Sequence, residues 1–361
     1  DRLEELGDFD ELAGNTGDGL IPNMMHTEPF EMNGKLYFAG QDPFYGNYTF
    51  PGMTEQNTRH AGSPLLAYDL KTGAFSNLGI PLPEQNSVFF VTGDARRSVL
   101  YLRRGYWEHI WYSLRIGTDG RPIGTPELLP FERHPKLIHV GPDGKLYFAL
   151  ERPIGDDEAT APPPPCDVYR YDPASGRSEV IATIDAAELH GAEFPVTRQR
   201  ISNYCTWIDG QHGAREIIGM INSVGMLVGI DTRTGQTRKI CLWLPETEAY
   251  PIHALGGVKA HDGKVYWFRR FTETPFHLSK LLVADVTTGA VTRYGTLLDQ
   301  RGRRVREVTQ MAFGTGGEIF CGGMIYGLPS DPYHMGRGGE SYKIDSGLFV
   351  VRDLDGRTSG W

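Results

Sequence analysis

The stretch Asp69-Leu-Lys-Thr-Gly73 recurs along the chain, and this repetition decides the predicted fold. It directly follows a short apolar run, Leu65–Tyr68. An Asp at the start of a turn accepts hydrogen bonds from the backbone ahead of it, and Gly supplies a positive φ. The motif therefore predicts a turn between two antiparallel strands. Its full copies are Asp69–Gly73, Asp172–Gly176, Asp231–Gly235 and Asp285–Gly289, with a shortened copy at Asp353–Gly356.

A second repeat precedes these turns. Asn33-Gly-Lys-Leu-Tyr-Phe38 matches residues 143–148 and 262–267, and residues 316–320 form a looser copy. Asn-Gly and Asp-Gly pairs that lead into an aromatic strand are typical of tight hairpins. Each unit therefore reads as strand A, tight turn, strand B, variable loop, strand C, Asp-x-x-x-Gly turn and strand D. Four antiparallel strands that repeat every ~40–60 residues indicate a β-propeller.

The repeats predict an all-β, six-bladed propeller that occupies residues 1–361 as a single domain. A seventh, degenerate blade is the alternative. The last unit lacks a clear strand D, and residues 3–7 resemble the strand D sequences of other units, so we expect the N-terminal strand to close the ring against residues 347–351. The six units cover residues 26–80, 86–130, 134–185, 200–246, 253–297 and 307–355.

Composition excludes some kinds of partner. The formal net charge is −9, whereas nucleic-acid binders usually carry a basic surplus, so no nucleic-acid partner is expected. No apolar run is long enough to cross a membrane, so no membrane partner is expected either. The four cysteines form no C-x-x-C pair, which argues against a zinc ribbon. A single glycosylation sequon, Asn47-Tyr-Thr49, points to a secreted or periplasmic protein.

Loop lengths predict which face of the propeller carries function. The A–B and C–D turns are short, whereas B–C connections at residues 42–63, 155–165 and 327–346 are long. The D–A connection at residues 186–200 is long as well. B–C and D–A loops share one face of a propeller, and long loops often carry function. We therefore expect the site on this face.

Polar side chains recur where the strands reach that face. They form a funnel of imidazole, amide, guanidinium and carboxylate groups, or else a merely solvated rim. The residues that lead into strand A are His26, Asn86, His134, Asn203, His253 and Glu307. The residues that end strand B are Gln41, Arg104, Glu151, Asn222, Arg270 and Met324.

Histidines are the first catalytic candidates. His26, His60 and His109 could converge over neighbouring blades. Histidine is the usual general base near neutral pH and also the commonest metal ligand. A divalent metal held by these histidines is therefore one possible cofactor, although no ligand-spacing motif supports it. The alternative for each is an ordinary hydrogen-bonded loop residue.

Tyr204 is the tyrosine candidate for proton transfer, with a buried inner-strand aromatic as the alternative reading. Guanidinium groups clamp carboxylates, and exposed aromatic rings stack on sugars, so the mixture on this face favours an anionic saccharide. The predicted substrate-binding residues are Arg59, Arg104, Arg152, Asn222, His253, Arg270 and Tyr326.

With these residues, the pattern resembles the propeller-fold polysaccharide lyases that act on ulvan or rhamnosyl-glucuronate linkages, and the related propeller rhamnosidases. The resemblance is architectural and rests on His26, His60, His109, Tyr204 and the arginines at the blade ends. It implies an enzyme that cleaves an acidic, uronate-containing oligo- or polysaccharide by β-elimination. A glycoside hydrolase on the same face is one alternative. A non-catalytic propeller that binds a glycan or a protein is the other.

Overall fold

The structure is a computed structural model that describes residues 29–39, 62–82, 88–104, 109–151, 165–190, 201–208, 215–221, 225–243, 258–273, 276–296, 305–313, 319–326 and 344–351. Regular structure in these ranges is almost entirely β-strand. The one helix among them, α2 (Ala186–His190), has five residues, so no described helix has the length to cross a membrane. The predicted all-β class is confirmed.

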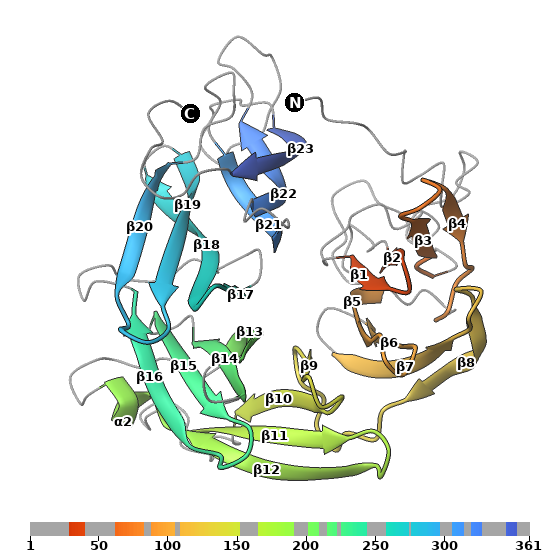
Figure 1. Ribbon diagram of the computed structural model, residues 1–361, viewed down its shortest axis with the longest axis horizontal. Helices are drawn as coiled ribbons and strands as arrows, with labels where there is room; N and C mark the ends of the chain where they lie inside the picture. The colour runs from red at the N-terminus through yellow and green to blue at the C-terminus, as the bar shows by residue number, and fades with distance from the viewer. Residues whose placement is uncertain are drawn as a thin grey trace, which may run out of the picture. The chain divides into compact units, whose positions relative to one another are not determined.

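The strands associate in chain order into separate sheets, which are the blades of a propeller (Figure 1). In the chain's compact unit 1 (Asp1–Leu146 with Asp172–Gly176) there are two complete blades. The first blade consists of β1 (Phe30–Met32), β2 (Lys35–Ala39), β3 (Leu65–Asp69) and β4 (Phe75–Asn77). The second consists of β5 (Val88–Asp94), β6 (Val99–Arg104), β7 (Ile110–Ile116) and β8 (Pro122–Leu128).

The third blade is divided between unit 1 and unit 2 (Tyr147–Tyr171 with Arg177–Trp361), and the later blades belong to unit 2. The third blade consists of β9 (His139–Val140), β10 (Leu146–Glu151), β11 (Cys166–Asp172) and β12 (Arg177–Ile184). The fourth consists of β13 (Ile201–Ile208), β14 (Arg215–Ile221), β15 (Met226–Asp231) and β16 (Thr237–Leu242). The fifth consists of β17 (Val258–His261), β18 (Lys264–Glu273), β19 (Phe276–Asp285) and β20 (Val291–Thr296).

The predicted number of six four-stranded blades needs correction. The described residues form five four-stranded blades, and the sixth unit forms a three-stranded sheet of β21 (Val305–Phe313), β22 (Ile319–Tyr326) and β23 (Ile344–Val351). The residues after Val351, where the sequence offers no good strand D, lie outside the described part of the structure. The predicted replacement for strand D, residues 3–7, lies outside the described residues, so closure by the N-terminal strand stays a prediction. The assignment of the whole chain to one domain also stays a prediction.

Both sequence repeats form the predicted turns. In the fifth blade, Asp285 Oδ1 accepts hydrogen bonds from the backbone N–H groups of Thr287 (2.9 Å) and Thr288 (2.7 Å), while Gly289 adopts a φ of 73°. Asp69 and Asp231 make the same pair of bonds. The bond from Thr288 is the main reason why the pKa of Asp285 lies below its usual value.

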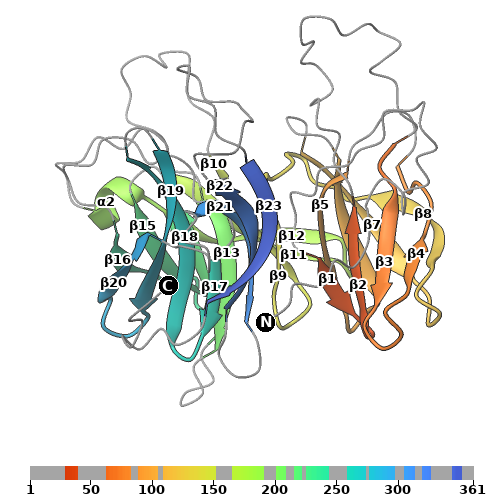
Figure 2. The ribbon, with the colours of Figure 1, turned by 90° about the horizontal axis from the view of Figure 1, so that it is seen from above.

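The two repeats meet across neighbouring strands. Lys35, from the tight-turn repeat, pairs in register with Asp69, from the Asp-x-x-x-Gly repeat, and donates to its carboxylate at 2.9 Å. This bond is the largest cause of the lowered pKa of Asp69. Lys264 and Asp285 are register partners in the fifth blade, where β18 and β19 lie side by side (Figure 2). In the first and fifth blades, the A–B turn and the C–D turn therefore lie side by side at the same end of the sheet.

The hydrophobic core lies between neighbouring blades. Successive side chains of a strand point to opposite faces, so each strand contributes to two such layers. In β18, Val265 and Trp267 pack toward the fourth blade, whereas Tyr266 and Phe268 pack toward the three-stranded sheet. In unit 1, the first and second blades share a comparable layer.

The glycines of two C–D turns form tight contacts between blades in unit 2. A Cβ atom added to Gly235 would collide with the backbone carbonyl oxygen of Ile181 on β12. A Cβ added to Gly289 would collide with the carbonyl oxygen of Ile240 on β16. Each turn therefore presses directly on the outer strand of the preceding blade. Gly176 has nearly the same positive φ as Gly235 but would meet nothing within 4 Å.

We predict that Gly235→Ala destabilises the protein more than Gly176→Ala. Both variants place a side chain at positive φ, which costs about 1–2 kcal/mol. Only Gly235→Ala also forces Ile181 to move, and overpacking of this kind adds about 1–3 kcal/mol. Urea unfolding midpoints of the two variants measure the difference. Equal losses would contradict the contact.

A second prediction concerns acid stability. The pKa of Asp285 is lowered in the folded state, so its carboxylate stabilises the fold above its unfolded pKa of about 3.9, and this contribution is lost as the pH falls through the folded pKa. Asp285→Asn should be less stable than the wild type at pH 7 and should lose less stability between pH 5 and pH 3. Unfolding midpoints across this range test it. Glu127→Gln, on the exposed part of β8, is the control for loss of one negative charge.

Candidate functional site

In unit 1, polar side chains gather at the B–C end of the second blade. β6 ends at Arg104 and β7 starts at Ile110, and these two residues are register partners. The chain that leaves β8 passes the same end of the blade on its way to β9. Trp111 Nε1 donates to the carbonyl oxygen of Pro135 at 2.8 Å, and the guanidinium of Arg103 donates to that of Lys136. We call Arg103, Arg104, His109, Trp111 and His134 the blade-2 site.

Arg103 is the buried cation of the blade-2 site. It is 1% exposed, and its guanidinium lies 4.5 Å from the ring centroid of Phe90 on β5. Arginine is seldom buried without compensation, and a ring face together with a carbonyl oxygen supplies part of it. Its strand neighbours Leu100 and Leu102 pack on the opposite side of the sheet, against the first blade. Arg103 therefore links β6 to the chain that leads into the third blade.

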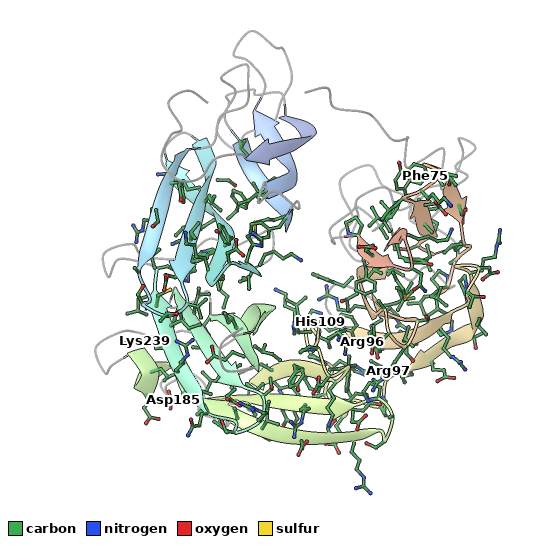
Figure 3. The ribbon with its side chains drawn as sticks, viewed as in Figure 1. Phe75, Arg96, Arg97, His109, Asp185 and Lys239 are labelled. Carbon is green, nitrogen blue, oxygen red and sulfur yellow. The ribbon has the colours of Figure 1, made fainter. Side chains whose placement is uncertain are left out.

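His109 has an unusual backbone. Its φ is 53°, a value uncommon for residues other than glycine, and it comes directly before β7 (Figure 3). Its Nδ1 atom is buried. Because the adjoining Ile110 pairs with Arg104, His109 and Arg104 lie at the same end of the blade. The structure thus brings together two residues that the sequence predicted for the site.

His134 is partly buried in the connection between the second and third blades. Its ring lies edge-on to Phe131, with centroids 6.1 Å apart. Within the described part of the chain, its buried Nδ1 atom has no hydrogen-bond partner. Burial lowers the pKa of His134 below 6.5, because the charged imidazolium would lose solvation. At neutral pH the ring is therefore uncharged and able to accept a proton.

The described part of the structure does not show the other predicted site residues next to one another. Tyr204 lies in β13 opposite Gly219, and Tyr326 ends β22 opposite Ile344, but their side chains are outside the described part. Arg270 was expected to end a strand, yet it pairs with Ser279 inside the β18–β19 hairpin, because both strands extend three residues farther. The residues that lie outside the described ranges altogether are His26, Arg59, His60, Arg152, Asn222 and His253.

Two pairs of adjacent arginines, Arg103–Arg104 and Arg269–Arg270, occur in β6 and β18, and their first members have different environments. Arg269 is 3% exposed, and its guanidinium lies 4.6 Å from the ring of Trp243, at the end of the fourth blade. Its strand neighbours Val265 and Trp267 face the same way. Arg103 instead faces away from the blade that precedes it. Arginines at similar sequence positions in two repeats can therefore point to different faces of their blades, because a shift of one residue along a strand moves its side chain to the other face.

The predicted metal site lacks support in the described residues, which contain no group of three His, Cys, Asp or Glu side chains suited to a metal ion. His26 and His60 are not among them, so the three-histidine site stays a prediction. The cysteines whose side chains are described, Cys166, Cys241 and Cys321, are buried and form no disulfide. Burial raises the pKa of Cys241 to about 12, so its thiol stays protonated at neutral pH and is a poor nucleophile or ligand.

Sequence reasoning assigned neither His134 nor Arg103 to the site. His134 belonged to the recurring polar positions before strand A, which was the available signal. For Arg103, the sequence gave only a weak indication of burial, which is that this charged residue directly follows the apolar run Val99–Leu102. What joins them is a pair of contacts from β6 and β7 to the segment after His134, and no local pattern reveals such contacts.

We predict that Arg103→Met lowers stability more than Arg104→Met. The first substitution removes the contact with Phe90 and the charged donor to the Lys136 carbonyl, at a cost of about 1–3 kcal/mol. Arg104 is partly exposed, so its loss should cost less than about 1 kcal/mol. Chemical denaturation of both variants tests this. A larger loss for Arg104→Met would show that the guanidiniums have the opposite roles.

The sequence matches no known protein family and no curated protein. Solved structures are similar in fold. A periplasmic gluconolactonase from Pseudomonas aeruginosa is 13% identical with a TM-score of 0.50, over 90% of this chain and 87% of that one. A fungal alcohol oxidase in complex with copper is 15% identical with a TM-score of 0.51, over 92% of this chain and 64% of that one. A protein from Lactobacillus plantarum is 12% identical with a TM-score of 0.50, over 86% and 82% of the two chains.

At these identities the similarity shows the fold alone, and it supports the propeller architecture. It also corrects the functional expectation. The prediction of a lyase acting on uronate polysaccharides depended on a resemblance in architecture, whereas the similar structures described above include a gluconolactonase and no ulvan lyase or rhamnosidase. The lyase prediction is therefore wrong.

Proposed function

We propose that the protein is an enzyme that hydrolyses the lactone of a sugar acid, and that the reaction takes place at the blade-2 site. The observation that carries the proposal is that Arg103 and Trp111 hold the segment after the uncharged His134 at the end of the blade where His109 and Arg104 also lie. The fold similarity to a gluconolactonase suggests the substrate class. Because that protein is periplasmic, we propose a secreted or periplasmic location for this chain, in agreement with the sequon.

The chemistry of lactone opening suits these groups. Water attacks the lactone carbonyl carbon, a new C–O bond forms, and the ring C–O bond breaks to give a hydroxy acid. Negative charge develops on the carbonyl oxygen in the transition state, where a guanidinium donor such as Arg104 stabilises it. An imidazole accepts the proton of the attacking water and returns it to the leaving ring oxygen. The product acid then ionises and releases one proton near neutral pH.

The remaining predicted residues keep a place in this proposal as ligand contacts. Tyr204, Arg270 and Tyr326 belong to unit 2, where we propose that they contact the hydroxyl groups of a sugar ligand. The same role is proposed for His26, Arg59, His60, Arg152, Asn222 and His253.

We predict that the purified protein accelerates the opening of glucono-1,5-lactone above its spontaneous rate, measured as proton release in weak buffer with a pH indicator. Arg104→Met should lower kcat/KM by about 10²–10³-fold, as expected for loss of one donor to the developing oxyanion. Arg121→Met, an exposed arginine in the C–D turn of the same blade, is the matched control and should keep the wild-type rate.

Two outcomes would contradict the proposal. If the wild type opens neither this lactone nor other five- and six-membered sugar lactones above background, lactone hydrolysis is wrong. If Arg104→Met and Arg121→Met lose the same rate, the activity does not depend on the blade-2 site.

A further inference from the structure

We propose that His134, and not His109, is the proton acceptor of the blade-2 site, and that Arg103 and Trp111 are the residues that position it. The inference rests on the proposed lactone hydrolysis and deepens it. Neither His134, Arg103 nor Trp111 was among the site residues predicted from the sequence.

The first step is the fixed position of the backbone at His134. The two residues that follow it, Pro135 and Lys136, are both held through their carbonyl oxygens. The donors come from two adjacent strands, since Trp111 is on β7 and Arg103 on β6. Both donors are almost completely buried, with exposures of 0% and 1%. The core of the second blade therefore holds the backbone that directly follows His134.

The second step is the state of the ring. Nδ1 of His134 is buried without a hydrogen-bond partner in the described part of the structure, and a buried polar atom of this kind is an exception that calls for a functional or solvent explanation. Phe131 makes a T-shaped contact with the ring, with centroids 6.1 Å apart. His134 keeps part of its surface exposed, so Nε2 is the nitrogen that a substrate can reach.

The third step is the charge around the ring. The titratable and charged groups on the surrounding elements are Arg103 and Arg104 on β6, His109 before β7, and Glu132, Arg133 and Lys136 in the connection itself. Glu132, the one carboxylate of this set, is exposed, and most of the others are cations. Burial is what disfavours the imidazolium of His134, and the exposed Glu132 does not offset it.

The reaction balances with this assignment. The water oxygen bonds to the lactone carbonyl carbon while one water proton moves to Nε2 of His134. The ring C–O bond then breaks, and the same proton passes from Nε2 to the leaving oxygen. One water is consumed, and His134 ends in its starting state.

The test is the pH profile of lactone opening by the wild type and three variants. His134→Gln should lower kcat by about 10²–10⁴-fold, the usual contribution of a general base, with little change in KM. Since the pKa of His134 is lowered, the wild-type rate should fall only below about pH 6.5, and this acid limb should vanish in His134→Gln. His109→Gln should keep the limb. His261→Gln, at the A–B turn end of the fifth blade, is the control and should match the wild type.

Trp111→Phe tests the positioning role. It keeps an aromatic ring in the buried position but removes the donor to Pro135, so kcat should fall about ten- to hundredfold with KM held and with an unchanged far-ultraviolet circular dichroism spectrum. The imidazole NMR signal of His134, assigned by its absence in His134→Gln, should also move in this variant.

The outcomes separate the two proposals. An active wild type with a fully active His134→Gln variant overturns this inference and leaves lactone hydrolysis standing. An acid limb that disappears in His109→Gln instead assigns the base to His109 and also overturns it. A wild type without lactonase activity overturns the proposed function and, with it, this role for His134.

Discussion

The contact of two C–D turns with the preceding blade, at Gly235 and Gly289, is the constraint on which much of unit 2 depends. The Asp side chain folds the turn by binding the next backbone N–H groups, and the Gly that follows brings the turn against a neighbouring strand. At Gly235 and Gly289 no room is left even for a methyl group. The local hydrogen bonds of the turn thereby fix the distance between two neighbouring blades. Apolar side chains from both blades fill the space between them.

This arrangement stabilises one end of the blades and leaves the other end for function. At the turn end, Lys35 and Asp69 meet across β2 and β3, and Lys264 pairs in register with Asp285 across β18 and β19. The turns at this end are short in every repeat that the structure describes. At the opposite end of the second blade, burial of Arg103 and Trp111 supports the segment that carries His134. The residues that hold the site are thus part of the core, whereas the residues proposed to react are at its edge. Catalytic groups benefit from such rigid support, because proton transfer depends on geometry.

The proposed reaction is lactone hydrolysis and not β-elimination, but both reactions would use the same kinds of residue. Imidazoles and guanidiniums at the blade ends remain the proposed chemistry. They were first interpreted as a carboxylate clamp and a base for removing a proton from carbon. An uncharged imidazole beside a guanidinium serves equally well to activate water at an ester carbonyl, which is the chemistry of a lactone. Residue types alone do not distinguish these reactions, and the propeller fold hosts more than one of them.

The sequence by itself determined the turns, the strand order and the all-β class, because an Asp side chain that binds the N–H groups two and three residues ahead is entirely local chemistry. It also placed His109 and Arg104 at one blade end, since both adjoin the same B–C loop. Only the tertiary structure decided that Arg103 faces away from the first blade, and that its guanidinium reaches a carbonyl 33 positions ahead. It alone showed the burial of His134. Side-chain direction and burial depend on strand register and on packing between blades, and both arise from contacts far apart in the sequence.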